Sequence, residues 1–142
     1  MIPQSFFDEL DELVSQLRTL SEKGVPIVVE GYKDERSLRA LGISGPILRL
    51  SGKNLLEIAE RLQRFDDFLI LTDFDRKGQE LTSRLFQYLS YRKVDLTRSF
   101  RRRFKNLISR VTCDIEGLAS SYLTFQNQTR RTGSIRRQES FI

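Results

Sequence analysis

The chain has 142 residues, a length typical of a single domain with one hydrophobic core. It contains no histidine and one cysteine, Cys113, which excludes an internal disulfide, a zinc site built from His and Cys, and a serine triad with its usual base. The net charge is +5 and is unevenly placed: residues 1–97 carry 14 basic and 16 acidic side chains, whereas residues 98–142 carry 10 and 3. This imbalance favours a polyanionic partner for the C-terminal third.

The first residues lack the basic start and apolar core of a secretory signal. No stretch nears the roughly 20 apolar residues that span a bilayer. We therefore expect a soluble, cytoplasmic protein in a reducing compartment.

In the first half of the chain, helical and strand patterns alternate. Residues 5–21 place apolar side chains three or four apart, the spacing of one helix face. Residues 25–29 are apolar and β-branched, which is typical of a strand buried on both faces. A helix over residues 34–42, a weaker strand over 46–50 and a helix over 55–62 follow.

The second half begins with a strand over residues 68–71, a helix over 79–91 and a short last strand over 94–96. From 98 to 111, apolar residues keep helical spacing while Arg and Lys fill most other positions, so this helix is predicted to be apolar inside and basic outside. Residues 126–142 are polar, with too few apolar groups to offset the entropy of ordering. We expect a flexible basic tail there.

Strands that alternate with helices indicate a parallel sheet with helices on both faces, because parallel neighbours need crossover connections. The predicted fold is a small doubly wound α/β domain with about four strands. We expect an N-terminal helix packed on the domain (1–24), the α/β core (25–97), a basic helical extension (98–125) and the tail (126–142).

Acidic residues end two of the predicted strands. Glu30 follows the first strand, and Asp73 and Asp75 follow the strand over 68–71. Ligands of open α/β sheets bind beyond the carboxyl ends of strands, so these three carboxylates are expected to converge if the strands are neighbours. Converging carboxylates need a cation, and an all-oxygen, histidine-free site suits Mg²⁺, with Mn²⁺ as a substitute. The alternative is that the acids only start turns and cap the next helix.

Several basic or flexible positions are candidates for phosphate contact. They are Lys33, Lys53, Lys77, Gly78, Arg101, Arg102, Arg103 and Lys105. Gly78 stands near a predicted helix start, where free amides favour anions. The four residues of the basic helix would bind a nucleic-acid backbone without regard to sequence. The alternative for each of these charges is ordinary solvation.

Two stretches, VVEGYKDERSLRALG at 28–42 and ILTDFDRKGQEL at 70–81, together resemble the Toprim domain family. The resemblance covers about residues 25–97. It implies a Rossmann-like fold and metal-dependent phosphodiester chemistry. Topoisomerases, bacterial-type primases and small ribosomal-RNA maturation nucleases share this domain, and the small stand-alone proteins similar to these nucleases fit this chain best.

The resemblance also implies roles for individual residues. Glu30 would be the general acid or base and a metal ligand, and Asp73 with Asp75 would coordinate Mg²⁺. Asp34 matches the first family motif. The DIEGL segment is similar to an acidic motif of some members, which makes Asp114 and Glu116 further candidates, with a surface helix as their alternative.

The function expected from the sequence is magnesium-dependent phosphodiester chemistry on nucleic acid by a small nuclease of the RNA-processing kind, or by a nucleotidyl transferase. RNA is favoured over DNA as the partner, and a homodimer or a place in a larger processing assembly is expected. Two alternatives stay open. One is a noncatalytic module that uses the metal to bind nucleic acid, and the other is a small-molecule phosphatase.

Overall fold

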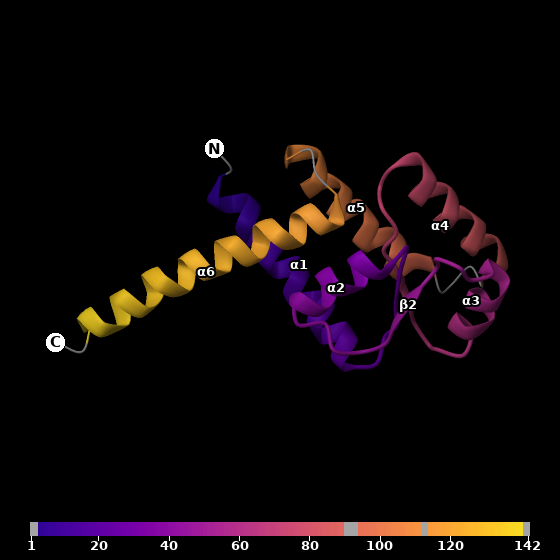
Figure 1. Ribbon diagram of the computed structural model, residues 1–142, viewed down its shortest axis with the longest axis horizontal. Coiled ribbons are helices and arrows are strands. Elements are labelled where there is room, and N and C mark those ends of the chain that lie inside the picture. Colours follow the sequence, from indigo (N-terminus) through magenta and orange to yellow (C-terminus); the bar gives the residue numbers. More distant parts are fainter. Residues whose placement is uncertain (1–2, 90–93, 112–113, 141–142) are drawn as a thin grey trace.

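Three short parallel strands form the centre of the protein, and helices lie on either side of them (Figure 1). The computed structural model describes residues 3–89, 94–111 and 114–140. In chain order, the elements are α1 (Gln4–Glu22), β1 (Ile27–Val29), α2 (Tyr32–Ala40), β2 (Ile47–Arg49), α3 (Leu55–Leu62), β3 (Leu69–Ile70), α4 (Arg76–Tyr88), α5 (Asp95–Val111) and α6 (Ile115–Ser140). The predicted α/β fold with a parallel sheet is confirmed.

The central strand β1 pairs in parallel with β2 on one side and with β3 on the other. Val28 lies opposite Leu48 of β2 and Ile70 of β3. All three residues of β1 are fully buried, as predicted for a strand covered on both faces. Because β1 and β3 are parallel neighbours, their carboxyl ends meet at the same edge of the sheet.

Different helices cover the two faces of the sheet. On one face, Val28 and Ile70 pack in a cluster with residues of α3 and α4, among them Leu62 and Leu85. On the other face, Val29 belongs to a larger cluster that takes residues from α1, α2, α5 and α6. The result is a layered α/β/α arrangement, in which burial of apolar side chains on both faces holds the strand ends in place.

Helix α6 returns to the first helix of the chain. The hydroxyl of Tyr122 donates a hydrogen bond to Asp11 Oδ1 at 2.6 Å, and Tyr122 is fully buried. The rings of Phe7 and Phe125 stack with centroids 4.1 Å apart. These contacts dock the first half of α6 against α1 and so fix where the residue before α6, Asp114, lies.

The strand predicted over residues 94–96 is wrong. Helix α5 begins at Asp95, so the described residues form three strands rather than about four. The physical reason lies at the outer edge of β3, where the amide of Ile70 donates to the hydroxyl of Thr97 at 2.9 Å. A side chain from α5 thus satisfies the backbone group that a fourth strand would have paired. The predicted end of the preceding helix at Tyr91 lies outside the described residues.

The sequence predicts a flexible basic tail beyond Gln126. In this segment the backbone of α6 continues as a helix to Ser140 and projects from the body of the protein (Figure 1). The first half of α6 is already docked, so each further residue extends an existing helix without the cost of starting one. Within the described segments, no helix is long and apolar enough to cross a bilayer.

Candidate metal centre

Glu30 and Asp73 meet at the carboxyl edge of the sheet. Glu30 directly follows β1, and Asp73 comes three residues after β3. The side-chain oxygen Oε1 of Glu30 accepts a hydrogen bond from the backbone amide of Asp73, with the two atoms 3.1 Å apart. The prediction that these two acids, 43 positions apart in the chain, share one rim of the sheet is therefore confirmed.

Asp75 lies at the start of α4. One of its carboxylate oxygens, Oδ1, accepts a hydrogen bond from the amide of Gly78 at 2.8 Å, so Asp75 is the N-cap of this helix. The residue between the two aspartates, Phe74, packs against the larger core cluster. Phe74 therefore faces the core between two aspartates that do not. Asp75 also caps the next helix, as the alternative interpretation of this acid expected, but only one of its carboxylate oxygens is used and the side chain is exposed.

Two further helix starts bring acids to the same place. Asp34 Oδ2 accepts from the amide of Gly31 at 3.3 Å near the start of α2. Asp114 Oδ1 accepts from the amide of Gly117 at 2.7 Å at the start of α6. Burial raises the pKa of Asp34, and the negative charges of Glu116 and Asp114 raise it further, against the lowering effect of the Gly31 hydrogen bond. The two downstream candidates, Asp114 and Glu116, thus lie close enough to act on the acidic site.

The electrostatic centre of this acidic site is Asp73. Its pKa is raised to about 6, first by burial and then by the negative charges of Asp34, Glu30, Asp114 and Asp75. Like charges at short range oppose ionisation of one another, so the ionised form of Asp73 is destabilised. A cation bound among these side chains would relieve that repulsion.

Arg101 lies behind the acidic loop. Its guanidinium donates to the backbone oxygens of Thr72 at 2.7 Å and of Asp73 at 3.1 Å, and it stands over the ring of Phe74 at 4.4 Å. Burial lowers the pKa of Arg101, while the charges of Asp73 and Glu30 act in the opposite direction. The prediction that Arg101 belongs to an outward basic face is wrong, because the side chain holds the loop that carries the aspartates.

Other cations of α5 are also used within the molecule. Arg103 hydrogen-bonds Gln16 Oε1 on α1. Arg110 forms an ion pair with Glu9 at 2.8 Å. Arg102 and Lys105 are exposed. Of the four basic residues proposed on this helix, these last two form its outward basic face.

Gly78 has a different role from the one predicted. Its amide donates to Asp75, and its carbonyl accepts from the hydroxyl of Thr72 at 2.8 Å. A Cβ atom at this position would lie 1.9 Å from the carbonyl oxygen of Asp73. Glycine is thus required because α4 packs directly on the aspartate loop, and the amide expected to bind phosphate is already used by Asp75.

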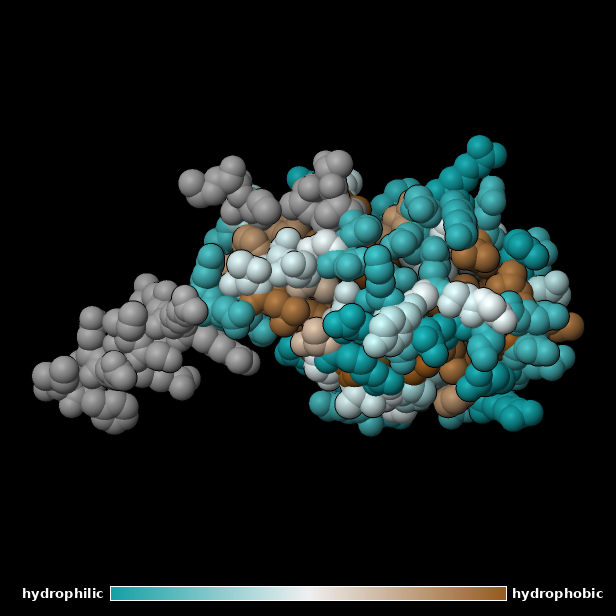
Figure 2. Space-filling view, viewed as in Figure 1, coloured by the Kyte–Doolittle hydropathy of each residue, from teal (hydrophilic) through white to brown (hydrophobic). Residues whose placement is uncertain are grey.

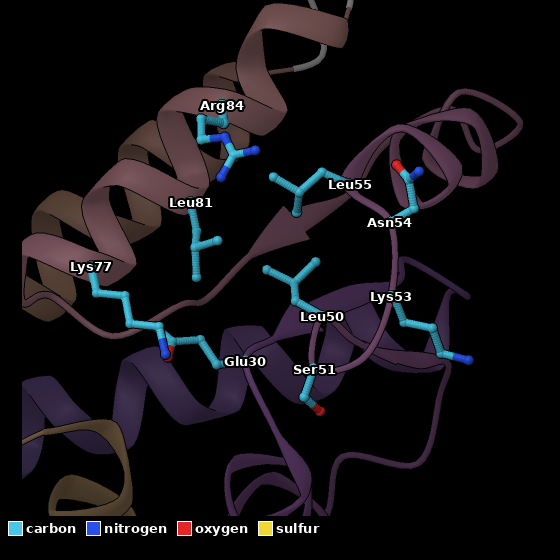
Figure 3. A pocket seen from close by; sticks show the side chains of 9 residues that line it. All are labelled: Glu30, Leu50, Ser51, Lys53, Asn54, Leu55, Lys77, Leu81 and Arg84. Atoms are coloured by element: carbon cyan, nitrogen blue, oxygen red, sulfur yellow. The ribbon is translucent and has the colours of Figure 1, made fainter.

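The three lysines predicted to bind phosphate are divided between two hollows. Lys53 and Lys77 line a cavity of about 500 Å³ together with Glu30 (Figure 3). Lys33 lines a second hollow of about 390 Å³, between α2 and α6, with Glu116. The structure therefore brings two of the lysines to the Glu30 side of the site and one to the side of α6.

Arg84 also lines the Glu30 cavity and was not predicted. It follows Lys77 by seven positions and Leu81 by three, which places the three side chains on one face of α4. The sequence shows this spacing, but it predicts a role for Arg84 only once Lys77 is known to face the cavity.

The acidic site fits magnesium by the chemistry of its donors. Carboxylate oxygens are the ligands of hard divalent cations, and Mg²⁺ is commonly held by one or two carboxylates with waters and substrate phosphates. In the part of the chain that the structure describes, no group of three acidic, histidine or cysteine side chains is arranged to hold a metal ion. The carboxylates of Asp73 and Asp75 are the donors that would hold the ion, with water and substrate phosphate as its further ligands.

These features define a class: a small α/β domain whose adjacent parallel strands end in a glutamate and an Asp-x-Asp pair. Residues 25–107 match the Toprim domain. The chain belongs to the Toprim domain family, as its motifs predict. Membership supports a metal-dependent function connected with nucleic acid.

Several relatives are close in sequence. A UPF0292 protein of Thermococcus sibiricus is 40% identical over 121 residues, which cover 85% of this chain and 94% of the relative. A UPF0292 protein of Methanosarcina acetivorans is 28% identical over 123 residues, covering 86% and 85%. A solved structure of a protein from Aquifex aeolicus has a TM-score of 0.56 and 24% identity over 68% of this chain and 91% of its own, a likeness of fold. The names of these relatives state no activity.

Proposed function

We propose that the protein is a magnesium-dependent nuclease that acts on RNA in preference to DNA. The observation that carries this proposal is the hydrogen bond from the amide of Asp73 to Glu30 Oε1, which places the carboxylate proposed to transfer a proton beside the loop proposed to bind the metal. The family to which the chain belongs supports a metal-dependent role on nucleic acid. The raised pKa of Asp73 supports a site built to gain a cation.

Asp73 and Asp75 would hold the ion, with Glu30 as a further ligand or neighbour. When bound, Mg²⁺ supplies Lewis-acid polarisation of a phosphoryl oxygen. The carboxylate of Glu30 takes the proton of the attacking hydroxyl or water, because it lies at the same rim as the aspartates and lines the adjoining cavity. Arg101 positions the loop through the carbonyls of Thr72 and Asp73.

The charges around the centre then have separate tasks. Lys53 and Lys77, on the cavity side, contact phosphates of the substrate as point charges. Asp34 and Asp114 extend the negative field toward α6 and strengthen the attraction for a cation. The exposed pair Arg102 and Lys105 binds the nucleic-acid backbone outside the centre.

A second candidate function is a noncatalytic module that binds nucleic acid with the help of the metal. The observation in its favour is the exposed pair Arg102 and Lys105 on α5, which can bind a nucleic-acid backbone without any bond being cleaved. Both functions require the same metal and the same polyanion, and they differ in turnover.

A cleavage screen separates the two. The protein is incubated with Mg²⁺ and structured RNA, single-stranded RNA and DNA, and duplex DNA, and wild type is compared with Glu30→Gln and Asp73→Asn. We expect cleavage by wild type and loss of cleavage in both variants, with Glu57→Gln on α3 as the matched control. Binding without cleavage on every substrate would favour the noncatalytic module, and equal cleavage by all variants would overturn the proposed site.

A further inference from the structure

The cavity beside Glu30 combines a positive rim with an apolar lining. It lies between α4 and the segment that joins β2 to α3, and it has a volume of about 500 Å³. Three leucines, Leu50, Leu55 and Leu81, extend into it (Figure 3). Hydrophobic residues also show between hydrophilic ones over α3 and α4 in the space-filling view (Figure 2).

The charged residues of the lining have a favourable balance for an anion. Lys77 and Arg84 supply two positive charges against the one negative charge of Glu30, and Lys53 lines the cavity with its side chain directed away from the leucines (Figure 3). Lys77 and Arg84 stand two turns apart on one face of α4, with Leu81 between them. The cations therefore border the apolar surface instead of being scattered over the molecule.

This combination matches one chemical unit of the substrate. A volume of about 500 Å³ lies within the roughly 300–1,000 Å³ of small-ligand pockets. A nucleotide offers an apolar base face to the exposed parts of the leucines and a phosphate to the cations, whereas inorganic phosphate offers no apolar face. A base inside a continuous duplex is stacked and paired and cannot enter such a pocket.

We propose that this cavity binds one unpaired nucleotide next to the reacting phosphodiester. Its base lies against Leu50, Leu55 and Leu81, and its phosphate contacts Lys77 and Arg84. The inference rests on the proposed function, because Glu30 in the cavity wall defines where the reacting bond lies. It adds substrate selection: the protein prefers single strands, ends or loops over continuous duplex.

Binding without turnover tests the inference. Fluorescence anisotropy is measured with a short single-stranded RNA, the same strand in a blunt duplex, and a single strand with one abasic unit, all in Ca²⁺ without Mg²⁺. We expect wild type to bind the intact single strand most tightly, and Arg84→Ala to weaken that binding about three- to tenfold and duplex binding by less than that. Arg84 is exposed, so the variant should fold. The matched control is Arg61→Ala, an exposed arginine of α3 outside the lining.

The outcomes separate this inference from the proposed function. Loss of single-strand preference in Arg84→Ala supports the inference even if no substrate is cleaved. The absence of cleavage would contradict only the proposed nuclease activity. Equal binding of single strand and duplex by wild type, or equal single-strand affinity in Arg84→Ala and wild type, overturns the inference even if Mg²⁺-dependent cleavage is found. Equal binding of the intact and abasic strands would likewise overturn it, because the leucines would then contact no base.

Discussion

The carboxylate of Glu30 accepts a hydrogen bond from the backbone amide of Asp73, 3.1 Å away at the rim between β1 and β3. This contact ties the ends of two adjacent parallel strands together through a side chain. The amide fixes one oxygen of Glu30 and leaves the carboxylate beside the aspartate loop. The carboxylate of Glu30 and the loop that carries Asp73 are thereby held side by side.

Replacing Glu30 with glutamine keeps an oxygen that can accept from the Asp73 amide but removes the proton acceptor. We expect the fold to survive and turnover to fall about 10²–10⁴-fold, the usual contribution of a general acid or base. The measurement is the rate of Mg²⁺-dependent cleavage, with circular dichroism to verify folding. Retention of more than a tenth of the wild-type rate would show that Glu30 transfers no proton in the rate-limiting step.

Asp73→Asn should make the metal-free protein more stable at neutral pH. The pKa of Asp73 is about 6 in the folded state, above its ordinary value of 3.8, so between these values the folded state binds more protons than the unfolded state. The contribution of Asp73 to stability is therefore full below about pH 4 and is lost as pH rises through 6. Because the Asp73 side chain is partly exposed and screened by solvent, we expect its ionisation to lower the free energy of unfolding by roughly 1 kcal/mol at pH 7.

Urea unfolding at several pH values measures this effect. The free energy of unfolding of Asp73→Asn should exceed that of wild type by roughly 1 kcal/mol at pH 7 and match it near pH 4. Asp66→Asn, at an exposed acid away from the acidic site, is the control. Mg²⁺ should stabilise wild type and leave Asp73→Asn unchanged, whereas a variant less stable than wild type at pH 7 without metal would contradict the electrostatic account.

Arg101→Ala removes a half-buried donor from two backbone carbonyls, those of Thr72 and Asp73. The two carbonyl oxygens would lose a charged hydrogen-bond donor but would remain partly shielded from water. The free energy of unfolding should therefore fall by about 1–3 kcal/mol. Cleavage should fall as well, because the aspartate loop loses its support. Arg102→Ala, at the next and exposed position of α5, should change stability by less than about 0.5 kcal/mol. Similar destabilisation by both variants would contradict the inward placement of Arg101.

The outward face of α5 should govern the salt dependence of binding. Replacing both Arg102 and Lys105 with alanine removes up to two phosphate contacts, which should lower the slope of log K against log salt concentration by as much as about 2 on duplex. Titrations of nucleic acid at several salt concentrations measure the slope. Glu57→Gln and wild type should share the steeper slope, and an unchanged slope in the double variant would remove this face from the interface.

The fold and the meeting of Glu30 with Asp73 could be predicted because both depend on local patterns. Buried parallel strands are apolar throughout, so β1 is visible in the sequence and Glu30 marks its end. Once strands are parallel neighbours, the positions of their carboxyl ends follow. The prediction failed at the sheet edge, since Thr97 can satisfy the amide of Ile70 from a helix as well as a strand could.

Whether a charged side chain points into the protein or toward solvent could not be predicted in the same way. Arg101 and Arg102 are adjacent and chemically identical, and only the packing of α5 against β3 turns one toward the Thr72 carbonyl. Asp114 reaches the site because α6 docks on α1 through Tyr122 and Asp11, a contact between residues 111 positions apart. Such choices depend on tertiary packing and leave no periodic signal.

Of the two glycines in the family motifs, Gly78 should be intolerant of alanine and Gly31 should tolerate it. At Gly78 a Cβ atom would lie 1.9 Å from the carbonyl oxygen of Asp73, and both groups are backbone, so the loop or α4 must move. Overpacking of this kind typically costs about 1–3 kcal/mol. At Gly31 a Cβ atom would meet nothing within 4 Å, and its φ of −151° is open to any residue. We expect Gly78→Ala to lose at least about 2 kcal/mol of stability together with metal-dependent cleavage, and Gly31→Ala to stay within about 1 kcal/mol of wild type.

Thermal unfolding with and without Mg²⁺ measures both effects in one experiment. If Gly78→Ala moves the aspartate loop, Mg²⁺ should raise its melting temperature less than that of wild type or of Gly31→Ala, because the carboxylates no longer stand where the ion binds. A Gly78→Ala protein with wild-type stability and an undiminished response to Mg²⁺ would mean that α4 does not pack on the Asp73 carbonyl. That result would contradict the close approach of α4 to the aspartate loop, which sets the position of the candidate metal ligands.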